Sequence, residues 1–140
     1  SFSTEPDRHA WACLEGDRVL GWAGRISVYS GHVWEMHPLL VDPLFQRRGI
    51  GRLLVETLEK RAREQGVLTI ILGADYETGA ANVSGIDLYP HIARHIAAAT
   101  GAHPLGFYRK LGYVVSGLIP DANGPGRPDI VMAKRIAGPK

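Results

Sequence analysis

The chain has 140 residues, of which 45% are hydrophobic and 21% charged, and its formal net charge is +2. This length and composition predict one domain, residues 1–140, that buries a core of its own. Because the charge is near neutral and basic residues gather only in one internal loop and at Lys134–Arg135, we expect neither nucleic acid nor a membrane surface as a partner.

Cysteine usage and hydropathy exclude further classes of protein. Cys13 is the single cysteine, which excludes an internal disulfide and a cysteine metal site and favours a cytoplasmic location. No apolar run reaches the ~18 residues of a membrane span. The chain starts at Ser1 without an initiator methionine, so an N-terminal portion is expected to be missing.

Alternating apolar residues predict a hairpin at the start of the chain. Its strands cover 9–14 and 18–28, with a turn at Glu15–Asp17 between them. A third strand is expected over 33–41. Pro38 within it cannot donate a ladder hydrogen bond, which indicates an edge, a bulge or a place where the strand separates from its neighbour.

A helix and a further strand follow. Apolar positions recur with a helical period from Ile50, and Gly66 ends the pattern. Acidic and basic residues four apart are expected on its wet face, namely Glu56 with Lys60 and Glu59 with Arg63. The apolar run 68–74 predicts a buried strand. Strand, helix and strand in this order predict a parallel crossover.

The second half of the chain is less regular. Asp87 is expected to cap a helix over 88–100, and a second short helix is predicted over 104–111. Strands are predicted over 113–119 and 129–135, joined by a loop rich in proline and glycine.

A metal site is not predicted. His91 and His95 lie four apart, as in zinc-binding HExxH helices, but Ile92 stands where that motif needs its glutamate.

The turn between the third strand and the first helix suits a diphosphate. Its glycines, Gly49 and Gly51, let the backbone approach a ligand, and a helix beginning here points unpaired N–H groups and its positive dipole end at it. Its arginines add donors with fork geometry suited to phosphate. The predicted site consists of Gln46, Arg47, Arg48, Gly49, Ile50, Gly51 and Arg52. A solvated strand–helix connection is the alternative. There is no GxxxxGK[ST], and Leu54 breaks GxGxxG.

Three residues could carry proton transfer. Glu35 and His37, two apart on the third strand, share a face, whereas Trp34 and Met36 point the other way. A carboxylate and an imidazole just before the loop could remove a proton from an attacking ammonium, although a pair facing water is the alternative. Tyr108 is either a half-buried helix aromatic or a phenol that donates to a leaving thiolate of comparable pKa.

These segments resemble the GCN5-related N-acetyltransferases, the GNAT family. The loop from Gln46 to Gly51 resembles their acetyl-coenzyme A pyrophosphate loop, and FYRKLGY resembles their FYxxxGF segment, whose Tyr is the usual general acid. The segments WEMHPLLV, DLYPH, HPLGFYRKLGY and IPDANGPGRPDIVMAKRI look like the aminoglycoside 6′-N-acetyltransferases of the chromosomal enterococcal type. The resemblance covers nearly everything from about Gly21 to Ile136.

The resemblance implies an α+β GNAT acetyltransferase fold, with a mixed, mainly antiparallel sheet and helices on both faces. The family's N-terminal strand and helix pair would be absent. It implies acetyl transfer from acetyl-coenzyme A to a primary amine, with Glu35 as base, His37 beside it and Tyr108 as acid. The cofactor would also contact Leu39, Leu40, Val41, Phe107 and Lys110. Because a cationic aminoglycoside needs acidic contacts, the candidate substrate residues are Trp34, Asp75, Asp87, Asp121 and Asp129.

Two alternatives to an aminoglycoside enzyme remain open. The enzyme could acetylate another small amine or a protein amine, but the long segment 75–103 would obstruct a peptide groove. A non-catalytic coenzyme A-binding protein is the other alternative, against which Glu35 and Tyr108 argue. A homodimer is expected because several strands are candidate sheet edges.

Overall fold

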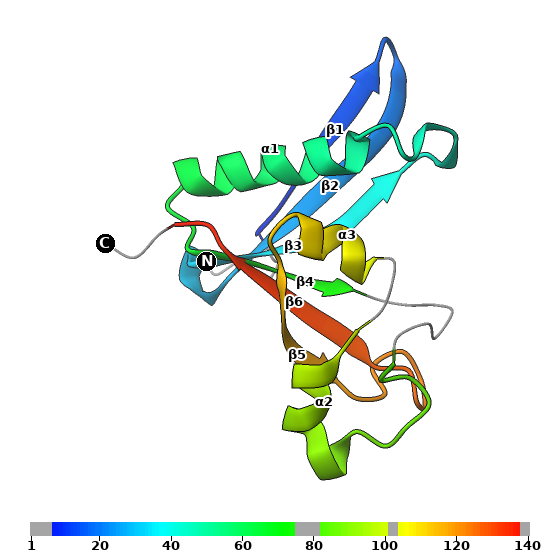
Figure 1. The fold of residues 1–140 in the computed structure, drawn as a ribbon. Coiled ribbons are helices and arrows are strands. Elements are labelled where there is room, and N and C mark those ends of the chain that lie inside the picture. Colours follow the sequence, from blue (N-terminus) through cyan, green and yellow to red (C-terminus); the bar gives the residue numbers. More distant parts are fainter. Residues whose placement is uncertain (1–6, 75–81, 101–103, 138–140) are drawn as a thin grey trace. The chain divides into compact units, whose positions relative to one another are not determined.

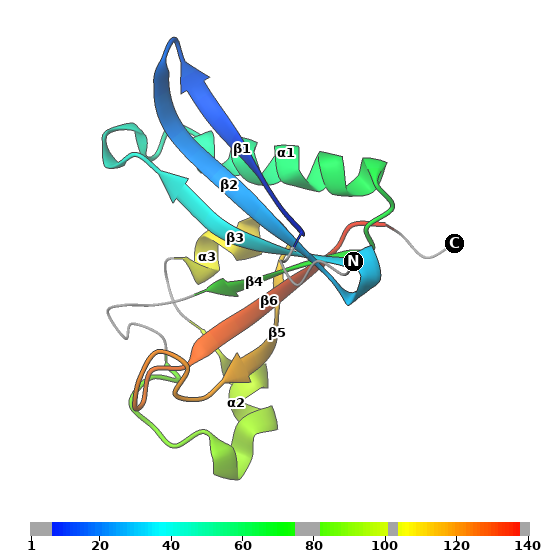
Figure 2. The same ribbon diagram turned by 180° about the vertical axis from the view of Figure 1, so that it is seen from behind.

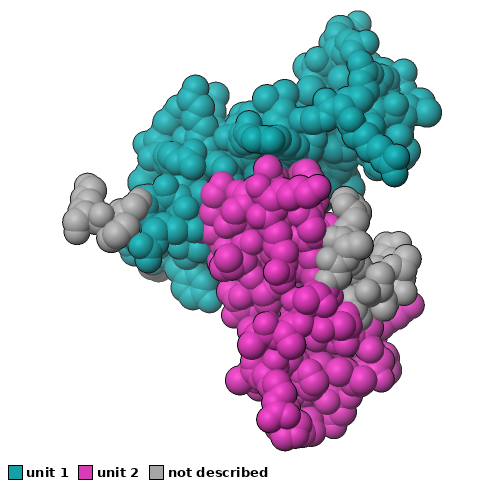
Figure 3. Space-filling view, viewed as in Figure 1, with its two compact units in different colours: residues 1–71, 135–140 teal, residues 72–134 magenta. Residues whose placement is uncertain are grey.

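The computed structural model describes residues 7–74, 82–100 and 104–137. Six strands form a mixed sheet in the order β1-β2-β3-β4-β6-β5, as the resemblance implied (Figures 1 and 2). The chain divides into two compact units, one of residues 1–71 and 135–140 and the other of residues 72–134 (Figure 3).

The first unit starts with the predicted hairpin. β1 (Asp7–Glu15) and β2 (Arg18–Val28) pair antiparallel around a turn that contains Gly16 at φ +60°, where residues with a Cβ are strained. After the 3-10 turn η1 (Tyr29–Gly31), β3 (Val33–Val41) pairs antiparallel with β2. β3 also runs parallel to β4 (Thr69–Ala74), which confirms the predicted crossover.

β3 is bulged where it meets β2. The register passes from Arg25↔Met36 to Ala23↔Leu39, which leaves two residues of β3 opposite Gly24. A Cβ on Gly24 would lie 2.6 Å from the carbonyl oxygen of His37, so only glycine permits this approach of the two backbones. One of these two residues is Pro38, which therefore lies in a bulge, one of the positions expected for it.

α1 (Ile50–Glu64) lies along one face of the first three strands (Figures 1 and 2). Gly66, at φ +77°, follows its end as predicted. The helix buries an apolar stripe of Ile50, Leu54, Val55, Leu58 and Ala62. The prediction that Glu59 lies on the wet face was wrong, since Glu59 is only 4% exposed. It lies one turn from both Val55 and Ala62 and so shares their packed side of the helix.

The second unit contains short helices and an antiparallel strand pair. Its elements are the 3-10 turn η3 (Tyr89–His91), α2 (Ile92–Ala98), α3 (Leu105–Lys110), β5 (Val114–Ile119) and β6 (Asp129–Arg135). β5 pairs antiparallel with β6, and α2 packs against β5. The regular helix begins at Ile92 rather than at residue 88, because His91 has a non-helical φ of −142°. Asp87 does not cap α2, whose N-cap His91 makes no side-chain cap, but its Oδ1 accepts the Tyr89 N–H at the start of η3 at 3.2 Å.

The bulge predicts a specific sensitivity at Gly24. In Gly24→Ala the new Cβ must displace the His37 carbonyl, and crowding of this kind destabilises proteins by about 1–3 kcal/mol. Gly106→Ala in α3 is the matched control, since a Cβ there meets nothing within 4 Å. We expect the urea midpoint to fall for Gly24→Ala and to hold or rise for Gly106→Ala. Equal midpoints for Gly24→Ala and the wild type would show that the two backbones are not in fixed contact.

Candidate functional site

β3 presents Glu35 and His37 on the face opposite its packed side. Trp34 and Met36 are buried, whereas Glu35 is half-buried and His37 is exposed, so the predicted alternation is confirmed. Within the described ranges, the Glu35 carboxylate has neither a hydrogen bond nor an ion pair. It is therefore a partly shielded base whose oxygens can accept a proton.

The bulge extends this face along β3. Glu35 and Leu40 are five residues apart and would point in opposite directions on a regular strand. Because Ala23 and Arg25 are two apart on β2, their partners Leu39 and Met36 share one face, and Leu40 therefore joins Glu35 on the other. Leu40 and its cross-strand partner Trp22 are both exposed. The result is a carboxylate beside an exposed apolar surface.

Trp34 has a different role from the one predicted. It is only 2% exposed, the guanidinium of Arg25 lies 4.7 Å from its ring centroid, and the ring of Trp11 stacks on it at 6.0 Å. Its burial contradicts the prediction that Trp34 contacts substrate, because packing already occupies the ring. Arg25 is itself buried and bonds the Asp7 carbonyl at 2.8 Å. The sequence contained no signal that this arginine would be buried.

The connection from β3 to α1 is a preformed turn. Asp42 accepts the Leu44 N–H at 2.9 Å and so starts the 3-10 turn η2 (Pro43–Phe45). Gly49, at φ +79°, is the N-cap of α1, and no atom lies within 4 Å of the place where its Cβ would be. This open space lets a ligand reach the first N–H groups of the helix, which have no acceptor inside it. Sequence reasoning missed Asp42, although Asp before Pro is a common turn signal.

The side chains of the predicted loop are mostly exposed, with Ile50 buried as its anchor. Gln46 reaches back to the Val41 carbonyl at 3.4 Å, a long hydrogen bond. Arg47 has φ +66°, an uncommon conformation for a residue with a side chain. Arg52 pairs with Glu56 at 2.8 Å on the helix surface. The loop therefore combines an open backbone with several cationic side chains.

Residues 39–41 pair with β2, in the register Leu39↔Ala23, Leu40↔Trp22 and Val41↔Gly21. The pairing of β3 with β4 runs from Val33↔Thr69 to Glu35↔Ile71.

Tyr108 lies in α3, within an aromatic cluster. Its ring meets those of Phe107 and Tyr113 edge-on, at 5.1 and 5.9 Å between centroids. The side chain is 9% exposed, and burial raises the pKa of Tyr108 from 10.0 to about 12. The expectation that this phenol matches a thiol in pKa is therefore wrong, because desolvation disfavours the phenolate. Lys110 ends α3 and is exposed.

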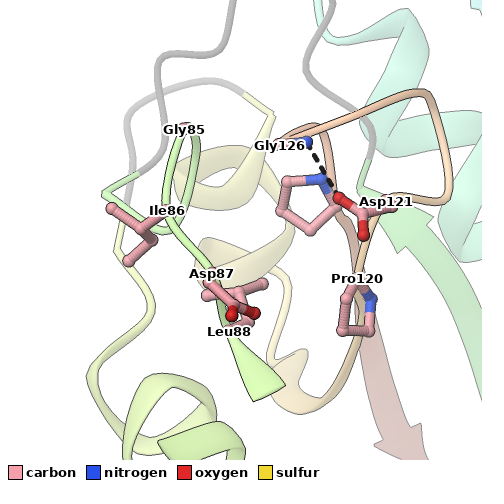
Figure 4. Close-up of a pocket in the computed structure, with 8 residues that line it drawn as sticks. Gly85, Ile86, Asp87, Leu88, Pro120, Asp121 and Gly126 are labelled. Carbon is pink, nitrogen blue, oxygen red and sulfur yellow. Dashed lines mark hydrogen bonds between the residues drawn. The ribbon is translucent and has the colours of Figure 1, made fainter. Parts of the chain in front are cut away.

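Two of the predicted acidic residues line a cavity of about 290 Å³ in the second unit (Figure 4). The Oδ1 atom of Asp121 accepts the Gly126 N–H at 2.8 Å, and the Oδ1 atom of Asp87 accepts the Tyr89 N–H. Asp129 is half-buried at the start of β6 and is not among the residues that line the cavity. Asp75 lies outside the described residues.

The predicted residues belong to different units. Glu35, His37, residues 39–41 and the loop 46–52 are in the first, whereas Phe107, Tyr108, Lys110 and the cavity are in the second (Figure 3). The described part of the chain holds no group of three or more His, Cys, Asp or Glu that could bind a metal ion. Nor does it contain a helix that is long and apolar enough to cross a membrane.

Comparison with known proteins gives a family match and close structural neighbours. The profile of the Acetyltransferase (GNAT) family matches residues 1–93. A crystal structure of aminoglycoside 6′-N-acetyltransferase complexed with coenzyme A is 39% identical, with a TM-score of 0.89, over 95% of this chain and 75% of that one. The aminoglycoside 6′-N-acetyltransferase from Enterococcus faecium is also 39% identical over the same shares of the two chains, with a TM-score of 0.87.

A curated protein matches a shorter segment. The [ribosomal protein bS18]-alanine N-acetyltransferase of Salmonella typhimurium is 45% identical over 51 residues, which is 36% of this chain. The matched part spans 32% of that relative's own length.

The burial of Tyr108 predicts a pH-dependent stability difference. Above pH 10 an unfolded tyrosine loses its proton, whereas folded Tyr108 keeps it to about pH 12, so the folded state binds more protons and loses stability as pH rises. Relative to Tyr108→Phe, wild-type stability should fall by about 1.4 kcal/mol per pH unit across this window. Urea unfolding of both proteins at pH 9 and 11 measures it. A constant difference would show that Tyr108 ionises normally.

Proposed function

The chain belongs to the GNAT acetyltransferase family, and from this premise we propose that it transfers an acetyl group from acetyl-coenzyme A to the 6′-amine of aminoglycosides. One observation carries the proposal. β3 leads directly from Glu35, whose carboxylate has no hydrogen bond within the described part of the chain, into a turn whose backbone is open at Gly49, where α1 begins. A base and an anion-binding turn on one continuous segment are what amine acetylation by a diphosphate-containing donor requires.

The fit of the cofactor rests on that turn. The N–H groups that start α1 and the guanidiniums of Arg47 and Arg52 hold the diphosphate, with Gln46 at the entrance of the turn and Arg48 as a further contact of the cofactor outside the diphosphate. The backbone of residues 39–41 pairs with the pantetheine arm, and the family resemblance adds Phe107 and Lys110 as candidate contacts of the cofactor. Acetyl-coenzyme A supplies the acetyl group as a thioester when it is bound.

The amine is activated by β3. Glu35, directly or through one water, takes the proton that the amine must lose as its nitrogen bonds to the acetyl carbon. His37, two residues along on the same face, lies beside this path. Backbone N–H groups of β3 donate to the thioester carbonyl oxygen and stabilise the charge that develops there. The carbon–sulfur bond breaks in the same transfer, and its sulfur leaves with the electron pair.

Tyr108 stays protonated at physiological pH, as an ordinary phenol does, and burial, which raises its pKa to about 12, widens the margin. Its hydroxyl is therefore a hydrogen-bond donor to the departing sulfur at all working pH values. Complete transfer of the phenolic proton to a thiolate is uphill, since an ordinary thiol has a pKa near 8.5. The role that fits Tyr108 is to stabilise the leaving sulfur with a hydrogen bond. The sulfur then takes its proton either by relay through the Tyr108 hydroxyl or from water.

The acidic residues favour a polycationic substrate. Asp87 and Asp121 place two carboxylates at one cavity, and each has a second oxygen besides the Oδ1 that accepts a backbone N–H. Asp75 and Asp129 are further candidate contacts. The similarity to aminoglycoside 6′-N-acetyltransferases at 39% identity supports this substrate class.

A protein amine is the second candidate. It is favoured by the 51-residue match to the ribosomal-protein alanine N-acetyltransferase.

For the assembly and location of the protein we propose a cytoplasmic homodimer. β1 is an edge strand of the sheet, which a second copy could cover, and Cys13 is a free thiol, as in a reducing compartment.

A substrate panel distinguishes these functions. We expect acetylation of kanamycin with kcat/KM well above that for a polyamine or for a peptide with an N-terminal alanine. Glu35→Gln should lower kcat by ~10²–10⁴, with a smaller loss at high pH, where more of the substrate amine is already neutral. Preference for the peptide would favour the second candidate. Binding of coenzyme A without turnover of any amine would show a non-catalytic protein.

The diphosphate turn predicts an effect on cofactor affinity alone. Gly51→Val places a branched side chain at the start of α1 and should raise the Kd for coenzyme A about 100-fold, through loss of charge-assisted hydrogen bonds. Leu53→Val is the matched control, because it adds the same branched residue at an exposed position of the same helix. Isothermal calorimetry measures both variants. If the affinity of Gly51→Val for coenzyme A is unchanged, the diphosphate does not bind at this turn.

A further inference from the structure

A pair of arginines that flanks one phenyl ring is not explained by the functions above. The guanidinium carbon of Arg18, from the start of β2, lies 4.6 Å from the ring centroid of Phe45. The guanidinium carbon of Arg48 lies 5.3 Å from the same centroid. Residues far apart in the sequence thus bring two positive charges to one ring at the end of η2.

The carboxylates near this ring leave most of that charge uncompensated. Arg18 reaches Asp42 at 3.5 Å, a long contact between partly exposed groups, and the other oxygen of Asp42 caps Leu44. Among the residues that the structure describes, Arg48 has no carboxylate partner. Two guanidiniums repel each other, and the ring quadrupole offsets only part of that repulsion. An anion that accepts hydrogen bonds from both would offset it.

We propose that Arg18 and Arg48 bind the ribose 3′-phosphate of coenzyme A. This inference rests on the proposed use of coenzyme A and adds a subsite to it. A phosphate monoester carries about −1.5 to −2 charges at pH 7, more than a single arginine balances. Both guanidiniums, held against the ring, can offer the paired N–H edge that phosphate accepts.

The position of the ring separates this subsite from the diphosphate site. Phe45 precedes the helix cap Gly49 by four residues, so the ring and the open N–H groups lie at opposite ends of the turn. Arg18 enters from β2 rather than from the turn itself. It is therefore placed for a third phosphate, whereas Arg47 and the start of α1 serve the diphosphate.

Calorimetry with coenzyme A and with 3′-dephospho-coenzyme A tests the subsite. The two ligands differ only in the 3′-phosphate, so the ratio of their dissociation constants isolates its contribution. We expect the wild type to prefer coenzyme A about tenfold, as two exposed charge-assisted contacts allow. The variant with both Arg18→Gln and Arg48→Gln should bind the two ligands within about twofold of each other, with little change in its affinity for dephospho-coenzyme A.

Two further variants control for charge and geometry. Arg8→Gln removes the same charge from an exposed position near the other end of the hairpin and should keep the wild-type ratio. Arg18→Lys keeps the charge but loses the fork, and should retain part of the preference.

The results separate this inference from the proposed function. Equal affinity of the wild type for the two ligands, or a tenfold ratio that survives in the double variant, would overturn the subsite while leaving coenzyme A as the cofactor. Failure of the wild type to bind either ligand would overturn the proposed function, and the subsite with it.

Discussion

The close approach of β2 to β3 at Gly24 decides how the functional face is built. The absent Cβ lets the His37 carbonyl lie against the neighbouring strand, and the extra residue of β3 is accommodated there. Without the bulge, alternation along β3 would turn Leu40 away from Glu35. With it, the carboxylate and an exposed apolar surface share one face while Trp34 and Met36 remain packed. A constraint on one glycine in β2 thus sets the direction of side chains in β3.

The regular elements of the first unit could be predicted from the sequence because local signals agree with the packing. Alternating apolar residues predicted β1 to β3, and the helical period of apolar residues from Ile50 predicted α1. Glycines marked the turns between these elements. Glu59 was misplaced because charge alone predicts exposure, whereas the helical position that a residue shares with Val55 and Ala62 decides its burial. The start of α2 was misplaced because no residue type signals the non-helical φ of His91.

The candidate site was predictable by residue but not by environment. Residue types, spacing and the family resemblance singled out Glu35, the turn around Gly49 and Tyr108, whose roles stay predictions. The sequence could not predict how strongly each side chain is desolvated, which decides its pKa. Desolvation of Tyr108 within its aromatic cluster separates its pKa from that of a thiol and changes its proposed role from proton source to hydrogen-bond donor. Trp34, likewise, was a plausible contact until its ring proved to be covered by Arg25 and Trp11.

The turn before α1 is held by contacts that do not depend on a ligand. Asp42 links three of them, because its backbone N–H donates to the Leu20 carbonyl at 2.8 Å, one carboxylate oxygen caps Leu44 and the other meets Arg18. These contacts fix the turn between β2 and the helix start before any anion arrives. A binding loop that is already ordered loses less conformational entropy on binding than a mobile one, so more of the electrostatic attraction appears as affinity. The proposed phosphate contacts therefore depend as much on one aspartate as on the arginines around it.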